Sequence, residues 1–177
     1  MAREPFDAAL LERAAAHFSR ASALRPLQPE LCLLRGEVLH ALGRADAMRA
    51  AVDECERRFG DGAAAADALP NATLAAVRLK FGRFYLQSGE PRAAIAALRG
   101  ALARRAAYPE ALADLASAHL MLARAPRDEH FATAERALAA ALELNPRDEQ
   151  VRAQLEQLRA SAAPSPPPKK KKKKRKP

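Results

Sequence analysis

The sequence contains no tryptophan, and aromatic residues make up only 5% of its 177 residues. β-Branched aliphatic residues are also scarce, since valine and isoleucine occur only at Val38, Val52, Val77, Ile95 and Val151. Aromatic and β-branched residues favour strands, whereas alanine, which is abundant here, is the strongest helix former. The composition therefore argues against a β-sheet protein and predicts an all-α fold with an aliphatic core.

Cysteine is rare too, because Cys32 and Cys55 are the only two. Two cysteines are too few for the disulfide framework of a small secreted domain. Both fall within apolar helical patterns, so we expect them to be buried free thiols in a reducing compartment.

Long apolar runs are missing, so no transmembrane helix is expected. The first residues include Glu4, Asp7 and Glu12, which is not typical of a signal or transit peptide. Together with the cysteines, these features predict a cytoplasmic or nuclear protein.

Recognisable catalytic motifs are also missing. The sequence has no HExxH, CxxC or GxSxG motif and no glycine-rich phosphate loop. The histidines His17, His40, His119 and His130 fall in four different helical segments, and only His40 and His119 are expected to share a face. We expect no enzyme activity, no cofactor and no metal site.

The net charge of +9 comes mostly from one end of the chain. Eight cations are consecutive there: Lys169, Lys170, Lys171, Lys172, Lys173, Lys174, Arg175 and Lys176. Subtracting them leaves residues 1–168 with a net charge of +1. The segment before the cations is proline-rich, so residues 162–177 are predicted to be a disordered tail that does not join the core.

The tail has three interpretations that the sequence leaves open. It suits a nuclear-import signal, or a tether to nucleic acid, the ribosome or an anionic membrane, or a tail that only improves solubility. It has no aromatic residue to stack on bases, so sequence-specific nucleic-acid recognition is not expected.

Apolar residues in the rest of the chain recur with helical spacing. Helices are predicted over 7–24, 29–42, 45–59, 72–88, 91–105, 109–123, 129–144 and 148–161. Residues 60–71 form a variable connection that begins with the breaker Gly-Asp-Gly. Because the other turns are short, consecutive helices should pack as antiparallel pairs.

Small residues repeat at fixed intervals within these pairs. Gly36 and Gly82 occupy equivalent positions of two predicted first helices, and Ala116 follows Gly82 by 34 residues. The second helices carry a matching trio: Met48, Val52 and Cys55; Ala94, Leu98 and Ala101; Ala134, Leu138 and Ala141. A fourth trio, Ala14, Phe18 and Ala21, has no first helix before it. We expect Gly36, Gly82 and Ala116 to lie where the second helix of the pair crosses closely, and Gly43 and Gly89 to end helices in a left-handed conformation.

This pattern resembles the tetratricopeptide repeat (TPR), a 34-residue helix pair. The last unit matches the family pattern at Leu112, Leu115, Ala116, Ala134, Leu138, Ala141 and Pro146. The chain departs from the pattern because Gly60 and Ala106 replace the usual proline and the first link carries extra residues.

The resemblance implies a right-handed α-solenoid over residues 7–161, after an N-terminal extension at 1–6. It comprises a half repeat at 7–28, repeats at about 29–62, 75–108 and 109–148, and a capping helix at 148–161. The missing first helix of the half repeat leaves the apolar residues Leu10, Leu11 and Phe18 for self-association or for a partner.

In such a solenoid the first helices line a concave groove, which the resemblance implies is the partner-binding surface. The groove residues would be Glu30, Leu33, Glu37, His40, Leu79, Arg83, Leu86, Glu110, Ser117, Leu120 and Met121. This mixed strip suits an amphipathic helix or an extended peptide. Some TPR proteins clamp the carboxylate of a chaperone tail, but Leu33, Glu37 and Lys80 or Asp114 stand at those positions here, so that ligand is not expected.

The sequence therefore favours a non-catalytic scaffold or adaptor that binds a protein partner in the groove and is localised by the polybasic tail. Two alternatives stay open. One is a nucleic-acid- or anionic-surface-associated protein that acts through the tail, and the other is a structural accessory subunit of a larger assembly.

Overall fold

The computed structural model describes residues 5–60, 63, 68–125 and 128–162, which form eight α-helices and no strand. The helices are α1 (Pro5–Leu24), α2 (Pro29–Ala41), α3 (Ala45–Phe59), α4 (Asn71–Gln87), α5 (Pro91–Arg104), α6 (Pro109–Leu122), α7 (Glu129–Leu144) and α8 (Glu149–Ala162). Every predicted helix is present, with ends within two residues of the prediction. The polybasic tail lies outside the described residues, as does most of the N-terminal extension.

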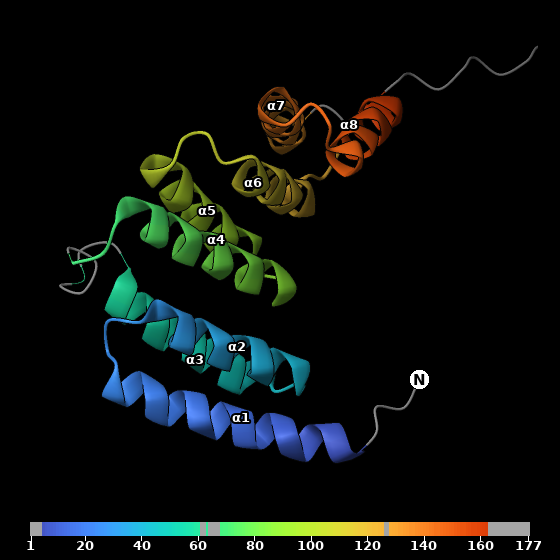
Figure 1. Cartoon of the computed structure of the whole chain (residues 1–177). Coiled ribbons are helices and arrows are strands. Elements are labelled where there is room, and N and C mark those ends of the chain that lie inside the picture. Colours follow the sequence, from blue (N-terminus) through green and yellow to red (C-terminus); the bar gives the residue numbers. More distant parts are fainter. Residues whose placement is uncertain (1–4, 61–62, 64–67, 126–127, 163–177) are drawn as a thin grey trace, which may run out of the picture.

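The helices follow one another along a stack that runs from α1 to α8 (Figure 1). Helices α2 and α3, α4 and α5, and α6 and α7 pack as pairs, and α4 also contacts α2 and α6. Helix α1 packs against α2 at one end, and α8 packs against α7 at the other. This arrangement confirms the prediction of an all-α solenoid of antiparallel helix pairs.

Local sequence sets the turns between the helices. Proline begins α2, α5 and α6, where its missing N–H is not needed for a helix hydrogen bond. Gly43 and Gly89 follow α2 and α4 with φ angles of 70° and 72°, as predicted, so the chain reverses through a conformation that suits glycine. The longer turn before α7 uses Asp128, whose side chain accepts a hydrogen bond from the Phe131 N–H at 2.7 Å.

Gly36 and Gly82 both allow close approach, but to different neighbours. A Cβ at Gly82 would lie 2.5 Å from Leu98 Cγ, which confirms the predicted crossing of α4 by α5. A Cβ at Gly36 would instead lie 3.0 Å from the Phe84 ring on α4. The closest neighbour of Gly36 therefore comes from the next helix pair and not from α3.

The prediction of free thiols is also wrong, since the structure joins Cys32 of α2 to Cys55 of α3 in a disulfide. The antiparallel packing of the two helices brings their Cα atoms to 5.9 Å across a sequence separation of 23 residues. A buried cysteine and a buried disulfide leave the same apolar helical pattern, so the sequence does not distinguish them. The prediction of a reducing compartment rested on free thiols, so it is no longer supported by the cysteines.

Candidate functional site

Two ion pairs link successive helices along the predicted groove. The Lys80 ammonium of α4 pairs with Glu37 of α2, and Arg83 Nε donates to an Asp114 carboxylate oxygen of α6 at 2.7 Å. Both pairs are partly exposed, so each contributes at most about 1 kcal/mol to stability. Their main consequence is electrostatic, because they neutralise the two cations at the centre of the groove.

The first of three cavities along this line lies between α2 and α4 and has a volume of about 470 Å³. Its lining includes Glu30, Leu33, Leu79, Lys80 and Tyr108. Leu33 and Leu79 are only 8% and 5% exposed, so they form an apolar floor that is part of the core. Glu30 is exposed and Lys80 partly exposed at this cavity, which therefore combines an apolar floor with charged edges.

The second cavity, of about 200 Å³, lies between α4, α6 and α8 and is polar. Arg83 and Asp114 line it as an ion pair, together with Glu110 and Asp148. Arg83 is one helical turn from Lys80 on α4, so the second cavity follows directly on the first.

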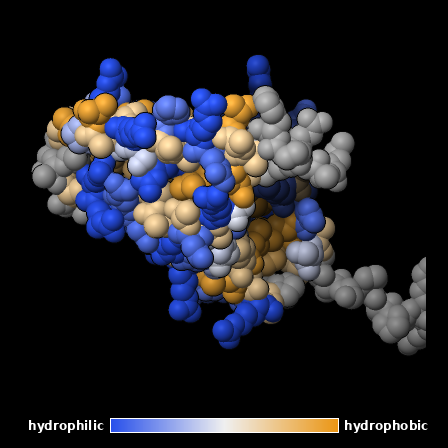
Figure 2. Space-filling model, turned by 90° about the horizontal axis from the view of Figure 1, so that it is seen from below, coloured by the Kyte–Doolittle hydropathy of each residue, from blue (hydrophilic) through white to orange (hydrophobic). Residues whose placement is uncertain are grey.

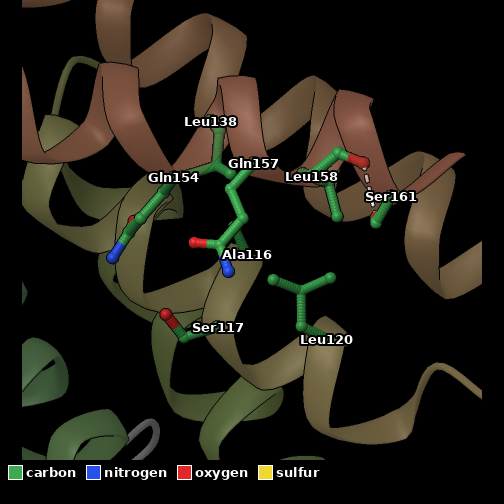
Figure 3. Close-up of a pocket in the computed structure, with 8 residues that line it drawn as sticks. All are labelled: Ala116, Ser117, Leu120, Leu138, Gln154, Gln157, Leu158 and Ser161. Carbon is green, nitrogen blue, oxygen red and sulfur yellow. Dashed lines mark hydrogen bonds between the residues drawn. The ribbon is translucent and has the colours of Figure 1, made fainter. Parts of the chain in front are cut away.

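The third cavity lies between α6, α7 and α8 and has a volume of about 260 Å³ (Figure 3). The side chains of Leu120 and Leu158 face each other across it, and the amide of Gln157 extends toward α6. The Ser161 hydroxyl donates to the Leu158 carbonyl at 2.7 Å. Ser117 and Gln154 line both this cavity and the second one, so the two are neighbours.

The structure thus brings most of the predicted groove residues into one line of cavities. Glu30, Leu33 and Leu79 line the first; Arg83, Glu110 and Ser117 line the second; Ser117 and Leu120 line the third. Glu37 joins this line through its ion pair with Lys80.

Three predicted residues lie elsewhere. His40 lines a separate cavity with Met48, Arg49 and Glu90, Leu86 packs partly buried against the core, and Met121 is 50% exposed. None of the three is among the residues that line the groove cavities.

Sequence reasoning missed the contribution of α8, which was expected only to cap the stack. Gln154, Gln157 and Ser161 of α8 line the third cavity, and Gln150 lines the second. Their spacing of three or four residues places them on one face of the helix. This polar stripe was the signal in the sequence that could have shown that α8 contributes to the cavities.

Two histidines meet at the junction of α6 and α7. His119 of α6 lies against His130 of α7, with the two Nδ1 atoms 3.0 Å apart. Burial lowers the pKa of His119, and the nearby His130 lowers it further. Across the described part of the chain, no group of three or more His, Cys, Asp or Glu side chains is arranged to hold a metal ion, and no helix is long and apolar enough to cross a membrane.

We compared the chain with known protein families, curated proteins and solved structures. No protein-family model matches the chain, and no curated protein is significantly similar to it in sequence. A solved structure of a MamA RS-1 double mutant is similar over 85% of this chain and 74% of its own, with 17% identity and a TM-score of 0.65.

Two further solved structures carry the same repeat. The TPR protein TTC0263 of the thermophile Thermus thermophilus is 23% identical, with a TM-score of 0.63 over 86% of this chain and 74% of its own. The first TPR of Spaghetti (RPAP3), bound to the HSP90 peptide SRMEEVD, is 16% identical, with a TM-score of 0.58 over 76% of this chain and 94% of its own. Together these similarities show that the chain has the tetratricopeptide-repeat fold.

Proposed function

We propose that the protein is a non-catalytic scaffold or adaptor that holds a peptide or helix of a partner protein in its groove. The observation that carries this proposal is the line of three neighbouring cavities along α2, α4, α6 and α8. A protein of the same fold has been solved with a bound peptide, which supports the proposal. The polybasic tail would localise the complex.

The charges of the groove favour a particular ligand chemistry. Lys80 and Arg83 are already paired with acidic side chains. Glu30, Glu110 and Asp148 have no ion-pair partner among the described residues, so the unneutralised charge is negative. We therefore propose a ligand that combines basic residues with apolar anchors. An acidic peptide such as SRMEEVD would be repelled by these carboxylates.

The test is a pull-down from native lysate with the full chain and two matched double variants. Glu30→Lys with Glu110→Lys reverses two exposed charges of the groove, and Glu143→Lys with Glu156→Lys reverses two exposed charges outside it. A partner that is retained by the wild type and the second variant, but lost by the first, would support the groove. Equal retention by both variants would contradict it.

The tail is the basis of a second candidate function, association with nucleic acid or another anionic surface. Eight consecutive cations favour such binding, and each neutralised phosphate on B-DNA contributes a slope of about −0.9 to log K against log salt. A chain ending at Pro168 separates the two functions, because it removes all eight cations and leaves the groove unchanged. If truncation abolishes binding and the lost partners also dissociate in salt, the tail is the main binding element.

A third candidate is a structural subunit of a larger assembly. Leu10, Leu24 and Leu27 near the first helix are 49%, 84% and 52% exposed, which is the kind of surface that an assembly would cover. A strictly monomeric protein that binds no dye specific for exposed apolar surface would contradict this candidate.

A further inference from the structure

The chain beyond α8 begins beside the line of groove cavities. Helix α8 ends at Ala162, and the preceding residue, Ser161, lines the third cavity. Figure 3 shows Ser161 and Gln154 on opposite sides of this cavity. Gln154 also lines the second cavity, together with Asp148, which directly precedes α8. The tail therefore starts at the third cavity, and the second cavity lies back along α8.

The order of residues in the tail matches the order of these cavities. All eight residues that line the third cavity are uncharged, and they include Leu120 and Leu158. The second cavity carries the carboxylates of Glu110 and Asp148, which have no ion-pair partner among the described residues. The tail begins with six residues that include four prolines and continues with eight cations. A tail that turns back along α8 would place its prolines on the leucines and its cations on the carboxylates.

The length of the tail is also sufficient. Helix α8 has 14 residues, so at 1.5 Å per residue it is about 21 Å long. The six residues 163–168 span about 19 Å in the extended polyproline conformation that consecutive prolines favour. Lys169 can therefore reach the Asp148 end of α8. The eight cations span about 25 Å more in the same conformation, so they can follow the groove toward Glu30 at the first cavity.

Attachment to α8 makes this contact easier to form than binding of a free basic peptide. A segment joined by a short linker has an effective concentration of about 1 mM at a neighbouring site. A tail that bound as a free peptide with a dissociation constant of about 0.1 mM would thus be docked about ten times out of eleven. Weak attraction between exposed charges is enough for this, and it should decrease as salt is added.

We propose that the polybasic tail docks in the groove of its own chain, with its prolines at the third cavity and its cations at the acidic second cavity. The tail has the chemistry assigned above to the ligand, because it combines basic residues with apolar groups. A partner must displace the tail to bind, and the displaced tail is then free to localise the complex. Docking is therefore an autoinhibitory contact, and this regulatory meaning rests on the proposed function of the groove.

Acidic side chains outside the groove are the main competitors for the tail. Figure 2 shows hydrophilic side chains spread over the face seen from below. Asp46 of α3 and Glu129 of α7 are exposed acids outside the three groove cavities. Like Glu30 and Glu110, each lies in the first turn of its helix. The four acids allow a matched comparison, because reversing either pair should have a similar effect on helix stability.

The test uses a protease that cleaves only after lysine. Lys80 is the only lysine in residues 1–168 and lies within α4, so the folded chain should be cut only in the tail. The cleavage rate at low salt is followed by mass spectrometry and divided by the rate for a free peptide of residues 163–177. Tail cleavage in the wild type should be about tenfold slower than in the peptide, which follows from the docked fraction above. High salt should remove this protection.

Two double variants locate the docking site. Glu30→Arg with Glu110→Arg should raise the cleavage rate close to that of the free peptide. Asp46→Arg with Glu129→Arg should leave the tail protected. Arginine is used because it reverses the charge without adding a cleavage site. Circular dichroism should show similar thermal unfolding for both variants.

Three outcomes would overturn the proposal. A wild-type tail that is cut as fast as the free peptide is not docked. Equal acceleration in both variants would mean that only net charge matters. Protection that increases with protein concentration would identify the groove of a second copy as the site.

The pull-down described above separates this inference from the proposed function. If protection of the tail depends on Glu30 and Glu110 but retention of a partner does not, docking is supported and the groove function is contradicted. If retention of a partner depends on them but the tail is cut freely, the groove function is supported and self-docking is overturned.

Discussion

The helix pair α4–α5 and the junction between α3 and α4 are held together by different kinds of contact. Within the pair α4–α5, Gly82 lies against the fully buried Leu98, and the neighbouring Ala94 and Ala101 are also fully buried. Interactions of this kind are apolar and depend on volume, because the small residue of one helix admits the large residue of the other.

The junction between α3 and α4 depends on charge instead. Glu56 of α3 accepts hydrogen bonds from the Tyr85 hydroxyl at 2.5 Å and from Arg78 at 3.3 Å. Arg49 of the same helix pairs with Glu90, and its guanidinium lies 5.0 Å from the centre of the Tyr85 ring. Apolar packing that depends only on volume allows one helix to slide or rotate on the other. These directional hydrogen bonds and ion pairs instead fix the position of one helix pair on the next.

The largest expected effect is in the apolar pair. Leu98→Ala should lower the free energy of unfolding by about 2–5 kcal/mol, since it leaves a cavity in a closely packed site. Gly82→Ala should lower it by roughly 1–3 kcal/mol, because the new Cβ would collide with Leu98. The double variant should lose less than the sum of the two, because removing Leu98 makes room for the methyl group. Urea unfolding measures the stability of all three variants. Strict additivity of the two single effects would show that Gly82 and Leu98 do not interact.

A smaller effect is expected at the polar junction. Glu56→Ala removes the acceptor for Tyr85 and Arg78, so it should cost about 1–3 kcal/mol in urea unfolding. Glu143→Ala, on an exposed part of α7, serves as the control and should change stability little. The pKa of Tyr85 is raised first by burial and then by the hydrogen bond to Glu56. Spectrophotometric titration of the Glu56→Ala variant should therefore show a Tyr85 pKa closer to its ordinary value but still above it.

The smallest effect concerns pH at the junction of α6 and α7. The pKa of His119 is lowered in the folded protein by burial, by His130 and by Arg99, against a weaker opposing influence of Glu129. A lowered pKa means that the unfolded chain binds the proton more tightly. The stability that neutral His119 contributes is therefore fully present above about pH 6.5, the ordinary histidine pKa, and it declines as the pH falls below that value. His119→Phe should flatten this decline in thermal unfolding measured against pH, and His17→Gln on the exposed face of α1 should not.

The sequence was sufficient for the helices and for the apolar pair. The signals behind these predictions are local or strictly periodic. They are the alanine content, the prolines and glycines at helix ends, and the 34-residue spacing of Gly82 and Ala116. The polar junction was not predicted, because Glu56, Arg78 and Tyr85 are separated by the variable link and only the superhelical geometry brings them together.

Two other features escaped prediction for the same reason. The disulfide and the His119–His130 contact depend on which residues lie opposite each other across two antiparallel helices. The repeat pattern shows which faces pack, but a shift of one helical turn would change these pairs without changing the pattern. At the cavities, the resemblance to the repeat family indicated residues of α2, α4 and α6. It gave no indication of the polar face of α8, because α8 was expected only to cap the stack.

The nearly complete replacement of lysine by arginine in the folded part has a practical consequence. Lys80 is the only lysine in residues 1–168, and it lines the first groove cavity while it pairs with Glu37. Reductive methylation with carbon-13 formaldehyde would attach an NMR-observable label to the Lys80 amine, to the N-terminal amine and to the tail lysines, which are adjacent in sequence. The arginines would stay unlabelled, so Lys80 would be the one labelled side chain in residues 1–168, and its resonance would report on any ligand that reaches the first cavity.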